Sequence, residues 1–117
     1  MILSLENKVA VVTGGGSGIG KAIALLFARQ RAHVYVLDKN NETAKATTDE
    51  IIKEGGSASS HAVDVTHQVD VIEVMKSIHL NANRIDILVN SAGIAHIGKL
   101  GTTDETNFDK IFNVNVK

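Results

Sequence analysis

Apolar residues in this chain form short β-branched runs that alternate with stretches of helical periodicity. The runs are typical of strands buried on both faces, and they predict strands at residues 9–13, 34–37 and 85–89. A further strand is expected at residues 58–63, where Ser59, Ser60 and His61 interrupt the apolar pattern. Apolar residues spaced three or four apart indicate helices over about 18–30 and 42–54, and from near residue 66. The capping-box pair Thr102 and Glu105 indicates a last helix from about residue 103 to the C-terminus.

This alternation of strands and helices predicts the fold class. The order is βαβαβαβα, which favours an α/β fold with a parallel sheet and helices on both faces. We therefore expect a Rossmann-like, doubly wound sheet of about four strands, truncated relative to a full domain. The chain contains no proline and no linker-like segment, so residues 1–117 are expected to form a single dinucleotide-binding domain that is incomplete at its C-terminal end.

The composition of the chain argues against several classes of binding partner. Of the 117 residues, 44% are hydrophobic and 21% charged, and the formal net charge is -1. Without a basic surface there is no electrostatic reason to expect nucleic acid or an anionic membrane. The chain has no cysteine, and its histidines share no ligand spacing, so no metal site is expected. The early charge at Glu6 argues against a signal peptide, and the expected location is the cytoplasm.

A glycine-rich loop joins the first strand to the first helix. It reads TGGGSGIG from Thr13 to Gly20 and holds five glycines in eight residues. Such a loop lets the backbone approach a pyrophosphate closely, while the helix N-terminus holds the phosphates. The ATP-type pattern is nearly present, with Lys21 after Gly20, but Ala22 stands where a magnesium-binding hydroxyl is needed. A P-loop-like nucleoside triphosphatase is thus a less favoured alternative.

An acidic residue follows the second strand. Asp38 lies 18 residues after Gly20, where a Rossmann half places a carboxylate on the adenosine ribose. A carboxylate about 4 Å from a 2′-phosphate costs roughly 1 to 4 kcal/mol, depending on screening. This favours NAD over NADP as cofactor, although Lys39 would soften the discrimination. Without the glycine loop, Asp38 would be read as a helix cap or a solvated loop residue.

The arrangement Thr13-Gly14-x-x-x-Gly18-x-Gly20, followed by Asn90-Ser91-Ala92-Gly93 after the fourth strand, resembles the short-chain dehydrogenase/reductase family. The resemblance covers residues 8–117. Ser91 departs from the family's Asn-Asn-Ala-Gly motif but can still form hydrogen bonds. The resemblance implies that the cofactor is bound by Gly14, Ser17, Gly18, Ile19, Gly20, Asp38, Asp64, Val65, Asn90, Ala92 and Gly93.

The resemblance also assigns roles to single residues. Members of the family that prefer NADP often carry a basic residue where this chain has Ser17, which again favours NAD. Asp64 matches the aspartate that contacts the adenine amino group, although it is equally suited to cap the next helix. Asn115 matches the asparagine that supports a catalytic proton relay, on what is expected to be the last helix. A surface or helix–helix contact is the ordinary alternative for such an asparagine.

The family's catalytic serine and Tyr-x-x-x-Lys pair would follow Lys117. Tyr35 and Lys39 have the spacing of that pair, but on a strand they would be about 13 Å apart, so Tyr35 is expected to be a packing residue. His96, in the loop after the fourth strand, is a weak candidate for a chemical role. The chain is thus expected to be the catalytically inactive cofactor-binding portion of an oxidoreductase.

The resemblance implies that the parent acts on a small-molecule alcohol or ketone and forms a homodimer or homotetramer. The alternative is a stand-alone nucleotide-binding module or pseudoenzyme. If the sheet ends at the fourth strand, residues 85–89 present an open apolar edge, and the isolated chain is expected to dimerise or aggregate.

Overall fold

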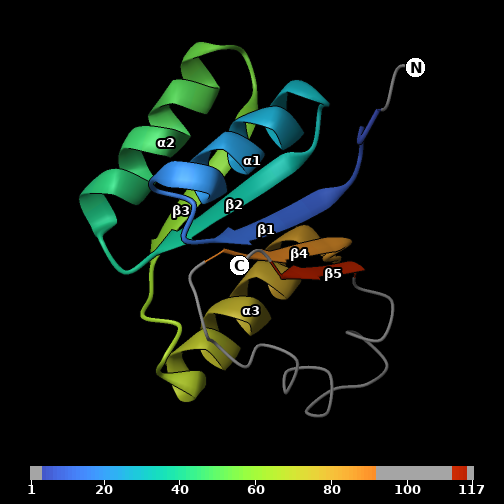
Figure 1. Cartoon of the computed structure of the whole chain (residues 1–117). Coiled ribbons are helices and arrows are strands. Elements are labelled where there is room, and N and C mark those ends of the chain that lie inside the picture. The colour runs from blue at the N-terminus through green and yellow to red at the C-terminus, as the bar shows by residue number, and fades with distance from the viewer. Residues whose placement is uncertain (1–3, 92–111, 116–117) are drawn as a thin grey trace.

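The computed structural model describes residues 4–91 and 112–115. Parallel strands alternate with helices along the chain (Figure 1). The elements are β1 (Val9–Thr13), α1 (Gly18–Arg29), β2 (His33–Asp38), α2 (Asn41–Lys53), β3 (Ser57–Ala62), α3 (Gln68–Ala82), β4 (Ile87–Asn90) and β5 (Phe112–Asn115). The strand order is β3-β2-β1-β4-β5, and every pairing is parallel. The expected Rossmann-like fold class is confirmed.

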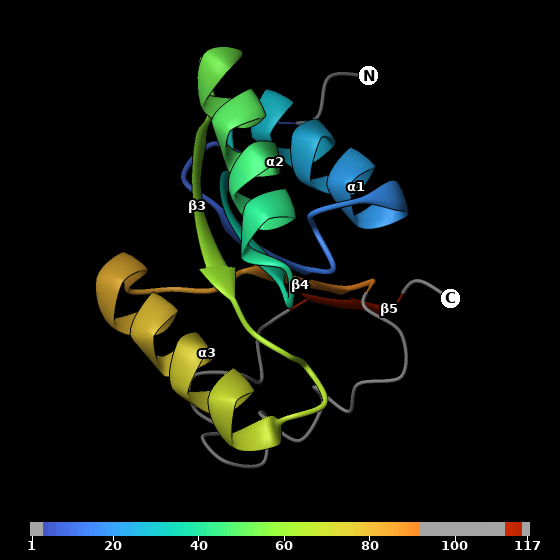
Figure 2. The same ribbon diagram turned by 90° about the vertical axis from the view of Figure 1, so that its left-hand side faces the viewer.

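Two layers of helices cover the sheet. Helices α1 and α2 lie on one face and α3 on the other, as Figures 1 and 2 show from perpendicular directions. Because side chains alternate across a strand, β1 contributes to two separate cores. Val9 and Val11 pack toward α3 with Met75, while Ala10 and Val12 pack toward α1 and α2. All five residues of β1 are buried, which makes it the central strand of the fold.

Helix α1 packs on the sheet through small residues. Its buried positions are Gly20, Ala24 and Ala28, which are spaced four apart and therefore lie on one side of the helix. Ala10 on β1 is small as well and is fully buried. Small residues on both sides allow the helix to approach the strand closely, and this proximity sets the position of the helix N-terminus above the carboxyl end of β1.

A fifth strand corrects two expectations. Residues 112–115 form β5 and pair with β4, so the prediction that they belong to a helix is wrong, as is the prediction that the sheet ends at β4. Apolar and polar residues alternate in Phe112–Asn115, which is the strand period, and the outer edge of β4 offers backbone groups that need partners. The rest of the expected helix, residues 103–111, lies outside the described residues.

The close packing of α1 predicts a strong response to a larger side chain. Ala24 is fully buried against the sheet, so Ala24→Leu should lower the free energy of unfolding by about 1–3 kcal/mol through overpacking. Ala22→Leu, on the exposed side of the same helix, should change it by less than about 0.5 kcal/mol. Urea denaturation of both variants measures this, and equal losses would contradict the packing described here.

Candidate functional site

The glycine loop is shaped by positions that only glycine fills without strain. Gly14 and Gly18 have φ of 66° and 58°, in the left-handed region that disfavours residues with a Cβ. Gly20 is required for a different reason, because a Cβ there would lie closer than 3 Å to the carbonyl oxygen of Gly14 and to Ser91 Oγ. The loop thus folds back on the first turn of α1 and lies against the end of β4.

The N-terminus of α1 is open to an anion. Its N-cap residue, Ser17, forms no side-chain capping hydrogen bond, and the first turn contains no acidic residue. Helix α2 differs, since Asn40 Oδ1 accepts hydrogen bonds from the backbone N–H groups of Glu42 and Thr43. Unsatisfied N–H groups and the positive end of a helix dipole attract phosphate. Of these two helices, only α1 has an N-terminus whose backbone N–H groups are not capped by a side chain.

A pocket of about 510 Å³ lies at the carboxyl ends of the strands, where open α/β sheets bind ligands. It gathers residues from the glycine loop and from the segments after β2, β3 and β4. They are Gly14, Ser17, Gly18, Ile19, Gly20, Asp38, Lys39, Val63, Asp64, Val65, Thr66 and Ser91. Sequence reasoning missed Val63 and Thr66 as lining residues, and the nearest signal was their position beside Asp64 and Val65.

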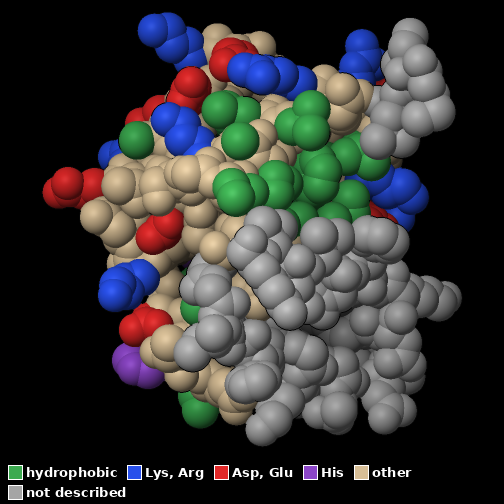
Figure 3. All heavy atoms as spheres, viewed as in Figure 1, with side chains coloured by type: hydrophobic (Ala, Val, Ile, Leu, Met, Phe, Trp, Pro, Cys, Tyr) green, Lys and Arg blue, Asp and Glu red, His purple; other side chains and the backbone are tan. Residues whose placement is uncertain are grey.

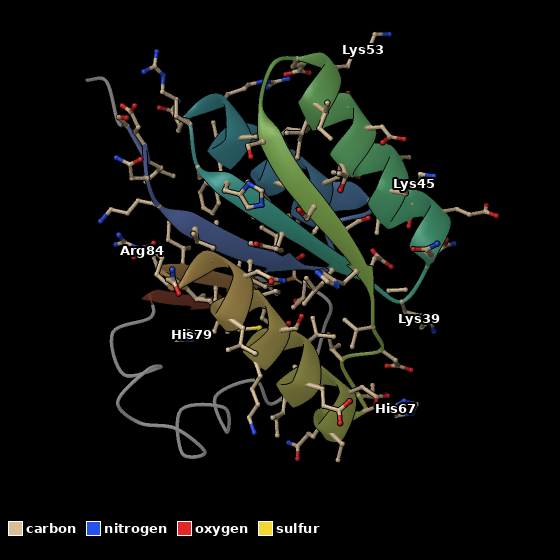
Figure 4. All side chains as sticks on the ribbon, turned by 180° about the vertical axis from the view of Figure 1, so that it is seen from behind. Lys39, Lys45, Lys53, His67, His79 and Arg84 are labelled. Atoms are coloured by element: carbon tan, nitrogen blue, oxygen red, sulfur yellow. The ribbon has the colours of Figure 1, made fainter. Side chains whose placement is uncertain are left out.

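Asp38 is held in place by two backbone groups. Its Oδ2 accepts a hydrogen bond from the N–H of Gly16 at 3.0 Å, and its Oδ1 accepts one from the N–H of Asn40 at 3.0 Å. The carboxylate is half-buried at the end of β2 and lines the pocket. Lys39 lines the same pocket and lies at the turn between β2 and α2 (Figure 4). The pocket is therefore lined both by a fixed carboxylate and by Lys39, whose charge acts on Asp64.

Asp64 organises the turn after β3. Its Oδ1 accepts hydrogen bonds from Thr66 Oγ1 at 2.7 Å and from Thr66 N–H at 2.9 Å. The bond from the Thr66 hydroxyl, followed by that from its N–H, lowers the pKa of the Asp64 carboxyl and keeps it ionised. The N-cap residue of α3 is His67, so Asp64 does not take the capping position that was its alternative interpretation.

The ends of β1 and β4 are joined by polar contacts. Thr13 is the register partner of Asn90, and its Oγ1 donates to Asn90 Oδ1 at 2.9 Å. Ser91 donates from its hydroxyl to the carbonyl oxygen of Thr13. Asn90 is 2% exposed, so it lies behind the pocket rather than in its lining. The serine that departs from the family motif thus forms a structural hydrogen bond and also lines the pocket.

Four further residues singled out from the sequence lie toward the C-terminal end of the chain. Ala92, Gly93 and His96 lie outside the described residues. Asn115 lies on β5 rather than on a helix, and it is the register partner of Asn90. This register places the Asn115 backbone at the carboxyl end of the sheet, the end at which the pocket lies.

Comparison with known proteins identifies the family. The family model described as short chain dehydrogenase matches residues 8–117. The chain belongs to the short-chain dehydrogenase family. Its relatives include a protein named an uncharacterised oxidoreductase from Thermotoga maritima, which is 40% identical over 115 residues, covering 98% of this chain and 45% of that protein.

Solved structures of this family contain both nicotinamide cofactors. An NAD+-bound xylitol dehydrogenase matches with a TM-score of 0.73 and 34% identity, over 77% of this chain and 35% of that one. A metagenomic short-chain oxidoreductase in complex with NADP matches with a TM-score of 0.74 and 37% identity, over 80% and 42%. These relatives support a nicotinamide dinucleotide as the ligand. This short-chain dehydrogenase chain spans less than half the length of the first curated relatives it matches.

Other features of this short-chain dehydrogenase chain bear on alternative activities. Lys21, at the lysine position of the ATP-type pattern, pairs with Glu50 on α2 at 3.1 Å and is thus engaged by a neighbouring helix. Within residues 4–91, no group of three or more histidine and acidic side chains is placed to hold a metal ion. No helix in the described part of the chain is long and apolar enough to span a bilayer.

Tyr35 is a core residue of this short-chain dehydrogenase chain. It is 7% exposed and belongs to the core on the α3 side. Its ring lies edge-on to His33, with centroids 4.7 Å apart, and stacks with His61 at 6.1 Å. Burial raises the pKa of the Tyr35 phenol, which keeps the phenol protonated and makes it a poorer proton donor. The predicted packing role of Tyr35 agrees with this environment.

The two histidines beside Tyr35 predict a loss of stability in acid. Burial lowers the pKa of both His33 and His61, so below the unfolded-state value of about 6.5 the unfolded chain binds more protons than the folded one. The free energy of unfolding should therefore fall as pH decreases from about 7 toward 5. Urea denaturation of the chain across this range measures the effect.

Replacing these histidines should weaken the pH dependence. The double variant His33→Gln/His61→Gln should show a flatter profile of unfolding free energy than the original chain. His67→Gln is the matched control, because His67 is exposed at the start of α3 (Figure 4). A profile for the double variant as steep as that of the control would refute this assignment.

Proposed function

We propose that this chain is the cofactor-binding portion of an NAD-dependent short-chain dehydrogenase/reductase. The parent enzyme would transfer a hydride between NAD(H) and a small alcohol or ketone. One observation carries the proposal: the uncapped N-terminus of α1 and the close-packed glycine loop face the same pocket as Asp38. The residues around this pocket offer a partner for each of the phosphate, the ribose and the base.

The residues present fit such a cofactor. Gly20 and the left-handed Gly14 and Gly18 keep the loop free of side chains, so that backbone N–H groups can reach a pyrophosphate. Asp38 offers acceptor oxygens to ribose hydroxyls, and the ionised Asp64 accepts hydrogen bonds from an amino group. The nicotinamide supplies the hydride acceptor or donor when the cofactor is bound. Ala92, Gly93 and Asn115 keep the roles that the family resemblance implies for them.

The same residues favour NAD over NADP. The Asp38 carboxylate repels a 2′-phosphate and accepts hydrogen bonds from a 2′-hydroxyl. Ser17 supplies no positive charge to offset this, whereas Lys39, which lines the pocket, supplies one. Because two backbone N–H groups fix the carboxylate, it cannot turn away from a phosphate without losing hydrogen bonds. The balance of these charges supports NAD as the cofactor.

Binding measurements test the cofactor assignment. NADH should bind about tenfold or more tightly than NADPH, as measured by the change in nicotinamide fluorescence on titration. Asp38→Asn removes the repelling charge and should bring the two dissociation constants to within about threefold of each other. Asp49→Asn, which removes an exposed carboxylate on α2 outside the pocket, is the control. Equal binding of both nucleotides by the original chain would contradict the assignment.

Two observations support a longer parent protein rather than a stand-alone module. The chain spans 45% to 47% of the first curated relatives it matches. Hydrophobic side chains also gather over α1 (Figure 3), and outside the pocket Leu26 on this helix is 51% exposed. An apolar surface of this kind is usually covered by another part of a protein. A pseudoenzyme remains the second candidate.

An activity measurement tests where the catalytic residues lie. The proposal places the catalytic serine and the Tyr-x-x-x-Lys pair outside this chain, so residues 1–117 alone should bind NADH and show no oxidation of alcohols. Monitoring NADH formation with NAD+ and a panel of secondary alcohols measures this, and a complete short-chain dehydrogenase is the positive control. Measurable turnover by the 117-residue chain would overturn the statement that its catalytic residues lie elsewhere.

A further inference from the structure

The selectivity-determining carboxylate, Asp38, lies at the junction of three elements. It ends β2, its Oδ2 accepts from the glycine loop at Gly16 N–H, and its Oδ1 accepts from Asn40 N–H just before α2. A carboxylate with both oxygens bound to backbone N–H groups has little freedom to rotate. Its orientation is therefore set by how the glycine loop and the start of α2 are placed relative to each other.

The start of α2 is itself tightly organised. Asn40 Oδ1 accepts hydrogen bonds from Glu42 N–H at 2.9 Å and from Thr43 N–H at 3.2 Å. Thr43 returns a hydrogen bond from its Oγ1 to the Asn40 carbonyl oxygen at 3.1 Å. These three bonds fix the Thr43 side chain on the first turn of the helix. They also fix the Asn40 N–H that holds Asp38.

Gly16 separates Thr43 from the carboxylate. Its φ lies outside the left-handed region, so conformation alone does not demand a glycine. A Cβ on Gly16 would instead lie 2.8 Å from Asp38 Oδ2 and closer than 3 Å to both Thr43 Oγ1 and Thr43 Cβ. The glycine is thus enclosed between the two side chains. Any side chain at position 16 must displace one of them, and Asp38 is the one that lines the pocket.

We propose that Thr43 is a positioning residue for cofactor selectivity: it fills the space beside Gly16 and so holds the glycine loop in register with Asp38. This inference rests on the proposed function. It names Thr43 as the residue that fixes the position of the Asp38 carboxylate, on which the choice between NAD and NADP depends. Thr43 is absent from the pocket lining and acts through Gly16 and Asp38. The ratio of NADH to NADPH affinity therefore depends on a contact between the loop and α2.

A double-mutant cycle on the 117-residue chain tests the contact. Gly16→Ala should displace Asp38, weaken NADH binding by about tenfold and change NADPH binding by less than about threefold, so that the affinity ratio falls. Thr43→Ala removes the Oγ1 that the new methyl group meets. In the Thr43→Ala background the loop can shift toward the space that Oγ1 vacates, so Gly16→Ala should cost less NADH affinity there than the roughly tenfold expected in the original chain.

Two matched variants separate positioning from general damage to the loop. Thr43→Ser keeps the Oγ1, so Gly16→Ala/Thr43→Ser should lose as much NADH affinity as Gly16→Ala alone. Gly15→Ala places its Cβ 2.9 Å from Val36 Cγ1 instead, so it should weaken both nucleotides equally and leave their ratio unchanged. Urea denaturation of every variant accompanies the titrations and identifies any variant that fails to fold.

The outcomes distinguish this inference from the proposed function. If the original chain binds neither nucleotide, or both equally, the NAD assignment fails and the inference fails with it. If the original chain prefers NADH and Gly16→Ala keeps that preference, the inference alone is overturned. Additive effects of Gly16→Ala and Thr43→Ala would overturn it as well, because the proposed contact requires them to be coupled.

Discussion

Parallel pairing of β1 on both of its edges is the constraint on which the rest of the structure depends. Thr13, its last residue, is in register with Leu37 on β2 and with Asn90 on β4. Parallel register brings the carboxyl ends of all these strands to one edge of the sheet. The glycine loop, Asp38 and Ser91 meet at that edge for this reason, although they come from distant parts of the sequence.

Close packing of α1 converts this register into a binding site. The small residues at Gly20, Ala24 and Ala28 let the helix lie near the strand, and the contact of Gly20 with the ends of β1 and β4 places the helix N-terminus at the pocket. The N-termini of α1 and α2, which share this face of the sheet, differ in their hydrogen bonding. Helix α2 satisfies its own N-terminus through Asn40, while α1 leaves its N-terminus available to phosphate.

The local sequence determined most of the helices and strands of this short-chain dehydrogenase chain and part of its candidate site. Up to residue 90, the helices followed from apolar residues three or four apart, and β1, β2 and β4 followed from continuous apolar runs. Strand β3 had the weakest pattern, because polar residues interrupt Ser57–Ala62. The glycine loop and Asp38 were predictable because pyrophosphate and ribose binding need those residue types at that spacing. Tyr35 was correctly expected to pack in the core, since residues four apart on a strand lie too far apart to cooperate.

Only the tertiary structure decided the rest. The strand over residues 112–115 depends on pairing with the free edge of β4, because four alternating residues are too short a pattern to distinguish a strand from a helix. Val63 and Thr66 became lining residues because the segment after β3 brings them to the pocket. The enclosure of Gly16 between Asp38 and Thr43 likewise needed the packing of α2 against the loop. Periodicity reports which face of an element is buried, whereas contacts between elements are set by how those faces meet in space.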